Sequence, residues 1–406
     1  MRAEDAKALV VGGGIGGLAA AIALRQAGWA VEVYEQAPAM GEVGAGLAIT
    51  TNAMRLLFEL GLTGLPQRGE AVTDAEGCTW QGEVLVKFPV LELAQRQGAP
   101  SVVIHRAALH SALREAFGPE GLHVGARLRG FEQDGAQVVA HFEGGREARG
   151  ALLVGADGLR SRVRAQLHGD KPPRYVGYPV WRGITPPFSH PGIPKGMLRE
   201  TQGRGGRFGM SYIAGDRVFW WAAVEGPAGQ PVPGGDKAYL AEVFQTAHAP
   251  IPELIAVTDA ADILRADTYD RRPLTRWGEG RVTLLGDAAH PMAPNLGQGA
   301  NSAIEDAFML ALALQEAEDI PSGLRAYEAW RKPRTALLQW QSWAFGAMGH
   351  WENPAAVWLR DGLMRRLPRR LVTGGLQRIW GWEPPLRQTV RVPKCKRRPR
   401  SQRAAP

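Results

Sequence analysis

The residues best suited to chemistry in this sequence begin with a cluster of glycines near the N-terminus. Gly12, Gly14 and Gly17 form a G-x-G-x-x-G pattern between a short apolar run at 8–11 and a helix-forming run at 18–25. Such glycines allow a tight turn, a close approach of the backbone to a pyrophosphate, and close packing of helix against strand. The N-terminus of the following helix favours the negative phosphates. The pattern predicts a turn that binds a dinucleotide.

An acid at the expected distance strengthens this interpretation. A second strand-like run at 30–34 ends in Glu35, and Gln36 follows it. In a βαβ unit, an acid in this position accepts the hydroxyls of the adenosine ribose. Because the carboxylate of Glu35 would repel a 2′-phosphate, we expect FAD or NAD here rather than NADP.

Two later segments repeat the combination of apolar strand, glycine and aspartate. The run 151–154 leads to Gly155 and Asp157, and the run 282–285 leads to Gly286 and Asp287. Each alone could be a helix-capping turn. Three nucleotide-suited turns in one chain are harder to explain in that way. Asp287 could accept hydrogen bonds from a sugar or a ribitol chain.

A glycine-rich loop follows the third turn and leads into a helix-forming run at 302–314. Gly297 and Gly299 would let the loop backbone approach a flat ring. The helix N-terminus at Asn301 would favour the negative charge that a reduced flavin develops.

Together, the three turns resemble the signatures of the single-component FAD-dependent monooxygenases of the aromatic hydroxylase type. Their order and spacing match, and the resemblance extends over residues 7–385, with similar segments at 105–110, 178–183 and 270–274. Within this family the chain is most similar to the urate hydroxylase, salicylate hydroxylase and zeaxanthin epoxidase branches.

The resemblance implies a role for each matching residue. Gly12, Gly14 and Gly17 would contact the FAD pyrophosphate, Glu35 the adenosine ribose, Arg106 the ribityl–phosphate region, and the Leu128 backbone the adenine. Asp157 would serve the FAD and the nicotinamide donor, and Asp287 would bind the ribitol. The isoalloxazine would lie against Pro294, Gly297, Gln298, Gly299, Ala300 and Asn301, and Gln36 and Gly286 would also bind the cofactor.

The resemblance also implies an α/β fold. We expect a Rossmann-like FAD-binding domain with three layers and a mostly parallel sheet, an antiparallel-sheet substrate domain, and C-terminal helices. The expected limits are 1–171 with 269–320 for the FAD-binding domain, 172–268 for the substrate domain, 321–386 for the C-terminal helices, and 387–406 for a basic, disordered tail. Alternating strands flank the glycines at 203–206, which favours a hairpin turn over a phosphate loop.

The family's reaction needs no metal. NADH or NADPH reduces the FAD, O2 adds at the flavin C4a carbon, and the hydroperoxide hydroxylates a small aromatic or heterocyclic substrate. A base that removes a proton from such a substrate would assist. Arg182, Arg207, Tyr212 and His290 are candidate catalytic residues, and hairpin packing, surface charge or a capped turn would explain each of them equally well.

Two alternative functions stay open. One is an epoxidase or hydroxylase of an aliphatic or isoprenoid substrate. The other is a flavin NADH oxidase or redox protein without oxygenase activity. The Trp-x-Trp-x-Ile-Pro signature expected of a flavin-dependent halogenase is absent from the sequence.

Composition limits the remaining classes. Apolar residues make up 45% and charged residues 22% of the 406, as in ordinary globular proteins. Two cysteines exclude a disulfide-rich scaffold and a thiolate-bound zinc or iron–sulfur site. The uncharged run at 8–24 contains five glycines, so we expect a cytoplasmic protein without a membrane span.

The net charge of +8 comes from the C-terminal end. Eight basic residues lie between Arg387 and Arg403, and removing them from the total of 48 leaves 40 basic and 40 acidic residues. We therefore expect no specific nucleic-acid partner, and at most a weak contact of the tail with an anionic surface.

Overall fold

The computed structural model describes residues 7–41 and 44–384, so the expected tail at 387–406 lies outside the described residues. A five-stranded parallel sheet has the order β18-β12-β1-β2-β8. Its strands are β1 (Lys7–Val11), β2 (Ala30–Tyr34), β8 (Leu122–His123), β12 (Leu152–Gly155) and β18 (Val282–Leu284). The inner strands are almost wholly apolar and buried, as expected for a parallel sheet covered on both faces.

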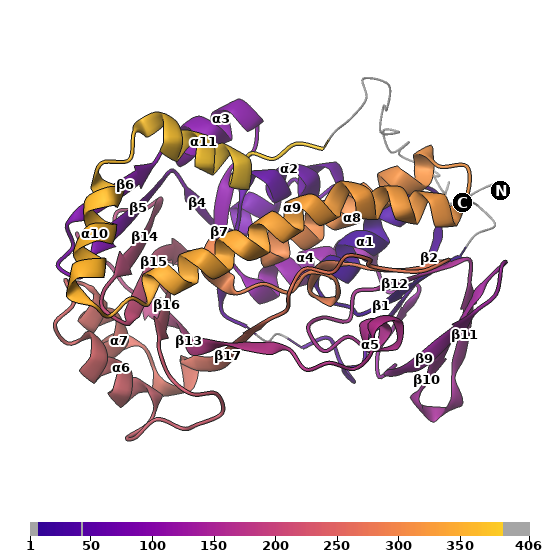
Figure 1. Ribbon diagram of the computed structural model, residues 1–406, viewed down its shortest axis with the longest axis horizontal. Helices are drawn as coiled ribbons and strands as arrows, with labels where there is room; N and C mark the ends of the chain where they lie inside the picture. Colours follow the sequence, from indigo (N-terminus) through magenta and orange to yellow (C-terminus); the bar gives the residue numbers. More distant parts are fainter. Residues whose placement is uncertain (1–6, 42–43, 385–406) are drawn as a thin grey trace, which may run out of the picture.

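Helices and a small antiparallel sheet cover the two faces of this parallel sheet. On one face lie α1 (Ile15–Gln26), α4 (Arg106–Phe117) and α8 (Gly299–Glu316) (Figure 1). On the other lie β9 (Leu128–Gln133), β10 (Val138–Phe142) and β11 (Glu147–Gly150), with α5 (Arg162–His168) and η3 (Glu143–Gly145) beside them. The three-layer FAD-binding fold predicted from the sequence is confirmed.

A second, seven-stranded sheet has the order β17-β13-β16-β15-β14-β5-β6 and is antiparallel except at the β14–β5 pair. Its strands are β5 (Asp74–Thr79), β6 (Val84–Phe88), β13 (Arg174–Pro187), β14 (Met197–Gln202), β15 (Gly206–Ile213), β16 (Arg217–Val224) and β17 (Leu264–Asp270). The glycines at 203–206 lie at the β14–β15 hairpin, as predicted.

The expected limits of 172–268 leave out two strands of this sheet. Strands β5 and β6 come from the segment assigned to the FAD-binding domain, and β5 joins the sheet by pairing with β14. The two paired segments lie more than 100 residues apart, and periodicity within either segment carries no sign of the other.

The two faces of the seven-stranded sheet differ. The outer face is covered by α6 (Asp236–Phe244), α7 (Ile251–Val257) and η4 (Ala260–Asp262), with Trp181, Phe208 and Trp220 buried beneath them. The inner face, with Ile213 and Phe219, packs toward the FAD-binding domain.

A three-stranded sheet joins the two domains. It consists of β3 (Gly46–Ile49), β7 (Ser101–His105) and β4 (Gly69–Val72) in the order β3-β7-β4. Helices α2 (Thr51–Glu59), η2 (Leu65–Arg68) and α3 (Val90–Gln97) complete this segment. Gly46 leaves room for the ring of Phe219, since a Cβ there would lie 2.4 Å from it.

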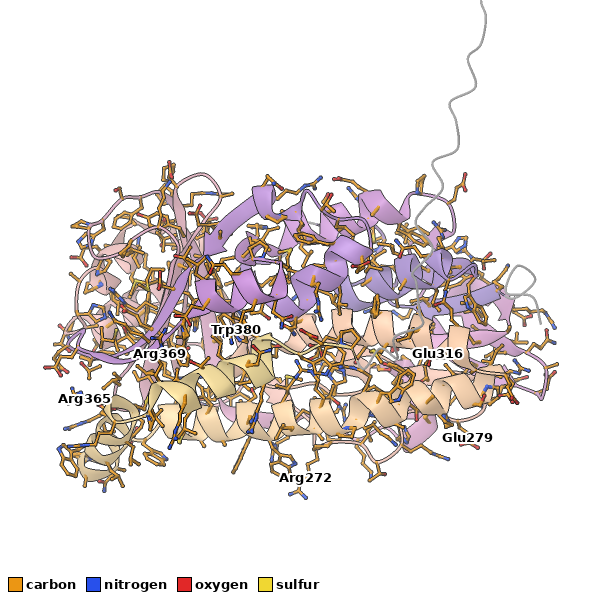
Figure 2. The ribbon with its side chains drawn as sticks, turned by 90° about the horizontal axis from the view of Figure 1, so that it is seen from above. Arg272, Glu279, Glu316, Arg365, Arg369 and Trp380 are labelled. Atoms are coloured by element: carbon orange, nitrogen blue, oxygen red, sulfur yellow. The ribbon has the colours of Figure 1, made fainter. Side chains whose placement is uncertain are left out.

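The C-terminal helices run along one side of the molecule (Figures 1 and 2). They are α9 (Ile320–Gly349), α10 (Pro354–Arg365) and α11 (Arg369–Trp380), and α9 packs along α8. Pro354 begins α10 and Pro368 is the N-cap residue of α11, so a proline lies at the start of each of these two helices. Within residues 7–41 and 44–384, no helix is both long and apolar enough to cross a membrane.

Candidate active site

The turns predicted to bind a nucleotide come together at one edge of the parallel sheet. Gly12 follows β1, Glu35 follows β2, Asp157 follows β12 and Asp287 follows β18, and these four strands are consecutive in the sheet. The carboxyl ends of parallel strands share one edge, where α/β sheets bind their ligands. Segments 270 residues apart in sequence therefore form one site.

The first turn is built so that only glycine fits at its base. Gly12 has a φ of +110°, and a Cβ there would lie 2.3 Å from the Ala156 carbonyl oxygen. A Cβ on Gly17 would lie 1.9 Å from the Gly12 carbonyl oxygen. At Gly14, by contrast, no described atom lies within 4 Å of the added Cβ. The backbone is thus open at the helix N-terminus, where a pyrophosphate fits.

The adenosine end of the site surrounds Glu35. Its carboxylate accepts hydrogen bonds from the backbone N–H of Gly13 at 2.7 Å and of Ala37 at 2.8 Å. Its carbonyl accepts from Ala126 at 2.8 Å, which brings the start of β9 at Leu128 beside it. Gln36 is exposed next to this acid.

Sequence reasoning missed His110, whose Nε2 lies 2.7 Å from the Gly13 carbonyl oxygen. It is one turn after Arg106 on α4 and braces the first turn from that helix. It ends the segment 105–110 that resembles the family, but nothing in that segment indicates a contact with the first turn.

The carboxylate of Asp157 caps α5. It accepts hydrogen bonds from the Ser161 hydroxyl at 2.5 Å and from the Arg162 N–H at 2.7 Å, while burial raises its pKa. This is the capping role considered as the simpler interpretation. Arg164, on the same helix, donates to the carbonyls of Ala288 and Ala289 at 3.1 Å each and so ties the second turn to the third.

The third turn carries an acid that solvent can reach. Asp287, in η5 (Gly286–Ala288), is accessible to solvent, yet protein surrounds it closely enough that burial raises its pKa. The carboxylate is therefore open to solvent on one side and close to other protein groups on the other. Arg106 at the start of α4 lies close enough to lower that pKa.

Arg106 also approaches a residue of the other domain. Burial lowers the pKa of Arg182, on β13, and the positive charge of Arg106 lowers it further. Neither guanidinium forms an ion pair or side-chain hydrogen bond with another residue that the structure describes. Two cations without a partner in the described part of the chain therefore lie near each other between the parallel sheet and the seven-stranded sheet.

The loop expected at the isoalloxazine is fixed by hydrogen bonds of the buried Asn301 side chain. It includes η6 (Pro294–Leu296), exposed Pro294 and Gly297, and half-buried Gly299 and Ala300. The Asn301 amide is buried and donates to the carbonyls of Gly297 and Ala48 at 2.7 and 3.0 Å, and its oxygen accepts from the Thr50 N–H at 2.9 Å. A Cβ on Gly299 would lie 3.9 Å from Asp287 Oδ1, so loop and acid border the same space.

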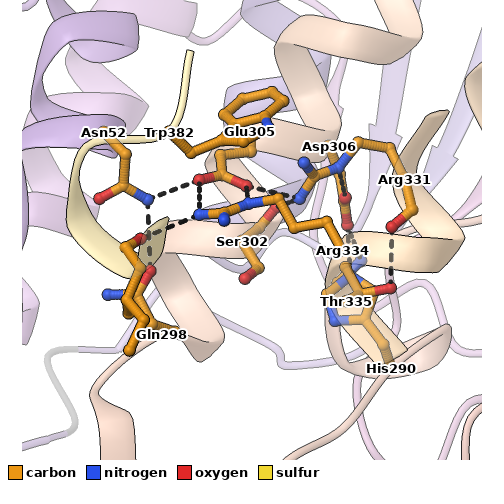
Figure 3. Close-up of polar contacts among 12 residues, drawn as sticks. Asn52, His290, Gln298, Ser302, Glu305, Asp306, Arg331, Arg334, Thr335 and Trp382 are labelled. Carbon is orange, nitrogen blue, oxygen red and sulfur yellow. Dashed lines mark hydrogen bonds and ion pairs between the residues drawn. The ribbon is translucent and has the colours of Figure 1, made fainter. Parts of the chain in front are cut away.

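A buried polar network beneath this loop joins it to α9 (Figure 3). Arg331 is fully buried between two consecutive acids of α8, donating to Glu305 Oε2 and to Asp306 Oδ1 at 2.7 Å each. Arg334 binds Glu305 as well, and the ring of Trp382 lies against both guanidinium groups.

Each acid supports a different part of the site. Glu305 accepts from the Asn52 amide at 2.5 Å, and Asn52 in turn donates to Gln298 at 3.2 Å. Asp306 accepts from the Gly286 N–H at 3.0 Å. Arg331 thus indirectly holds both the loop and the third turn. The only signal in the sequence was this pair of acids inside the apolar run at 302–314.

The four candidate catalytic residues fall in different places. His290 is buried, and its Nε2 binds Asp306 at 2.5 Å, which makes it part of this network. Tyr212 points to the outer face of the seven-stranded sheet, where its hydroxyl donates to the Phe188 carbonyl at 3.2 Å. Only Arg182 and Arg207 lie on the inner face, toward the site.

Arg207 belongs to a compact polar cluster over η6. It donates to Glu200 at 3.2 Å and to Asn295 Oδ1 at 2.5 Å, and the Tyr178 hydroxyl donates to the same oxygen at 2.8 Å. His350 at the end of α9 stacks on Tyr178, and burial together with Arg207 lowers its pKa to about 4. Its imidazole is therefore neutral at pH 7. Among the described residues, no group of three or more His, Cys, Asp or Glu side chains is arranged to hold a metal ion.

Alanine substitutions at two glycines of the first turn should have different effects, one on stability and the other on FAD binding. Gly17→Ala should lower the free energy of unfolding of the apoprotein by about 3 kcal/mol or more, because the new Cβ meets backbone. Gly14→Ala should change it by less than about 1 kcal/mol but weaken FAD binding at least tenfold. Urea unfolding of the apoproteins and fluorescence titration with FAD measure the two effects. Equal FAD affinity of Gly14→Ala and wild type would contradict the site.

Arg331→Met should cost about 3–5 kcal/mol of stability, because it removes the guanidinium partner of the buried Asp306 carboxylate and leaves Glu305 with Arg334 alone. Lys332→Met is the matched control: this exposed neighbour donates only to the Thr275 carbonyl and should cost less than about 1 kcal/mol. Urea unfolding at pH 7 measures both. Equal costs would show that the network does not stabilise the fold.

The network also predicts a loss of stability in acid. Burial alone raises the pKa of Asp306, but His290 and Arg331 lower it to about 2, against 3.8 in the unfolded chain. Because the pKa of Asp306 is lower in the folded than in the unfolded state, ionisation of this carboxyl stabilises the folded protein by about 2 kcal/mol above pH 4. This contribution is lost as the pH falls from 4 to 2. The stability of Asp306→Asn should fall less steeply over that range in urea unfolding.

Comparison with known proteins agrees with this geometry. Residues 5–341 match the FAD binding domain family. The aurachin C monooxygenase/isomerase of Stigmatella aurantiaca is 40% identical over 88% of this chain and 94% of its own length. The FAD-dependent urate hydroxylase of Klebsiella pneumoniae is 33% identical over 82% of this chain and 87% of its own. The zeaxanthin epoxidase of Solanum lycopersicum is 37% identical over 82% of this chain, which spans about half of that longer protein.

Solved structures show the same architecture. Klebsiella pneumoniae HpxO complexed with FAD and uric acid superposes with a TM-score of 0.85 at 29% identity, covering 93% of this chain and 97% of that one. The family match extends across the four turns, the loop and the seven-stranded sheet described above. The chain therefore belongs to the FAD binding domain family and, within it, to the single-component FAD-dependent monooxygenases.

Proposed function

We propose that the protein uses NADH or NADPH and O2 to hydroxylate a small aromatic or heterocyclic substrate. The observation that carries this proposal is a pair of arginines, Arg106 and Arg182, which have no ion-pair partner within residues 7–41 and 44–384 and lie near each other between the FAD-binding turns and the inner face of the seven-stranded sheet. A cationic site between the cofactor edge and a second domain suits a substrate that becomes anionic during the reaction.

The inner face offers a flat apolar surface next to Arg182. Trp221 on β16 pairs with Arg182 on β13, so the two side chains project from the same face. The indole lies over Gly209, where an added Cβ would come 1.9 Å from the ring. Because Trp221 is only half-buried, its ring leaves surface against which an aromatic substrate could stack.

We assign the following roles. When bound, FAD supplies electron transfer from the nicotinamide donor and the activation of O2. Arg182 stabilises the negative charge that appears when a phenolic or ring N–H proton leaves the substrate. Arg207 acts through Asn295 to hold η6 and is a positioning residue. We assign no catalytic part to Tyr212, which lies on the opposite face, or to His290, which binds Asp306.

Epoxidation or hydroxylation of an isoprenoid substrate is the second candidate. The apolar character of the inner face, with Ile184, Leu198 and Phe219, supports it, as does the likeness to zeaxanthin epoxidase. Such a reaction would proceed without a cation that stabilises a substrate anion, which separates it from the first candidate.

The test starts from the purified yellow protein after its FAD has been identified by its visible spectrum. Candidate phenols and hydroxylated heterocycles should stimulate NADH or NADPH oxidation, with O2 uptake and a hydroxylated product in equal amounts. Arg182→Met should lower kcat/KM for an ionisable aromatic substrate about 10- to 100-fold, because the transition state would lose one hydrogen bond to a charged group.

Arg217→Met is the control, since Arg217 lies at the far end of β16 and donates to the Ala214 carbonyl. It should leave kcat/KM unchanged. An Arg182→Met enzyme that keeps full kcat/KM for an ionisable aromatic substrate would contradict the role of Arg182, whereas turnover of isoprenoids and of no aromatic substrate would favour the second candidate. Hydrogen peroxide as the sole product with every substrate tried would indicate an NADH oxidase instead.

A further inference from the structure

We propose that the outer surface of the C-terminal helices docks on an anionic lipid membrane without crossing it. Large apolar side chains that are exposed to solvent are concentrated there: of the 15 recorded, ten lie between residues 337 and 371. They are Leu337, Trp340, Trp343, Met348, Trp351, Trp358, Leu359, Leu363, Leu367 and Leu371. We call these ten residues the C-terminal apolar surface.

The second half of α9 exposes aromatic side chains and carries no charged residue on its outer side. The segment 335–351 contains no Lys, Arg, Asp or Glu. Its inner side packs on the protein through Leu338, Ser342 and Gly346, whereas Trp340 and Trp343 are 53% and 46% exposed on the outer side. An aromatic, uncharged outer face is atypical of a helix that meets only water.

Helix α10 carries the pattern further. Its one buried residue is Arg360, which donates to the Met348 carbonyl at 3.2 Å. Trp358 is 76% exposed and Leu363 60% exposed. The apolar residues of α10 therefore contribute little to the core of this chain, and burial elsewhere would explain them.

Charge identifies the partner as an anionic lipid surface. Residues 352–406 contain 14 Lys and Arg against three acids, which leaves 34 basic and 37 acidic residues in the rest of the chain. Exposed arginines at 365, 366, 369 and 370 adjoin the apolar residues, although Arg365 and Arg369 also pair with Glu83 and Glu92. Figure 2 shows Arg365 and Arg369 at the end of the molecule where α10 meets α11.

Tryptophan, leucine and arginine together are typical of helices that lie in the headgroup region of a membrane. If a second copy of this chain docked there, two C-terminal segments with an excess of positive charge would meet, and they would repel each other. Each basic residue near an anionic lipid surface instead raises the affinity of the protein for that surface roughly fivefold.

The experiment is co-sedimentation of the full-length holoenzyme with phosphatidylcholine vesicles, with and without phosphatidylglycerol. We expect binding to the anionic vesicles that weakens as salt is raised, and little binding to phosphatidylcholine alone. Trp358→Ser with Leu363→Ser should reduce binding at least tenfold, while the retained FAD spectrum reports a folded protein. Val257→Ser with Leu264→Ser, exposed positions on α7 and β17, is the matched control and should bind as wild type.

Three results would overturn the proposal. Absence of binding to anionic vesicles would do so directly. Binding that disappears on deletion of 387–406 but is unaffected by the Trp358 and Leu363 substitutions would place the contact in the tail alone. A dimer in light scattering that the same double substitution dissociates, without vesicle binding, would identify a second copy as the partner. Quenching of tryptophan fluorescence by brominated lipid, reduced in Trp358→Phe, would support insertion of the helices.

Discussion

Burial of the Arg331 guanidinium between Glu305 and Asp306 is the interaction on which the arrangement of the site depends. Without it, Glu305 would keep Arg334, but the fully buried Asp306 would keep no guanidinium partner among the described residues, and an unpaired buried charge costs several kcal/mol. The two acids project from one turn of α8 toward different neighbours. Glu305 accepts a hydrogen bond from Asn52, which contacts the loop, and Asp306 accepts one from the Gly286 turn. A single cation on α9 thus places two parts of the cofactor site relative to each other.

The second constraint is geometric. Four consecutive parallel strands end at one edge, so residues far apart in the chain reach the same ligand. The seven-stranded sheet then covers this edge with its inner face, and Phe219 fits against Gly46 to hold the two domains together. Helix α9 spans both domains and places Gly346 against Asn295 and Tyr178, where a Cβ would lie 2.3 Å from the Asn295 amide nitrogen.

The turns were predictable from the sequence because local residue types decide them. Gly12, Gly17 and Glu35 act within one βαβ unit, and their spacing is visible in thirty residues. Tyr212 was harder to place, because a strand's pattern gives two faces but not which of them meets the cofactor domain. The roles of Arg331 and His110 depend on contacts between distant segments, and so does the entry of β5 and β6 into the second sheet. No periodicity within a segment reports such contacts.

Because the site is assembled from residues 12–17, 35, 157 and 286–301, no contiguous fragment shorter than 12–301 contains it. An unfolded or partly folded chain has little affinity for FAD, so the cofactor acts thermodynamically as a ligand of the native state alone. At a free FAD concentration 100 times the dissociation constant, this linkage adds about 2.7 kcal/mol to the stability. The supply of FAD in the surrounding solution therefore helps to set the fraction of the protein that is folded.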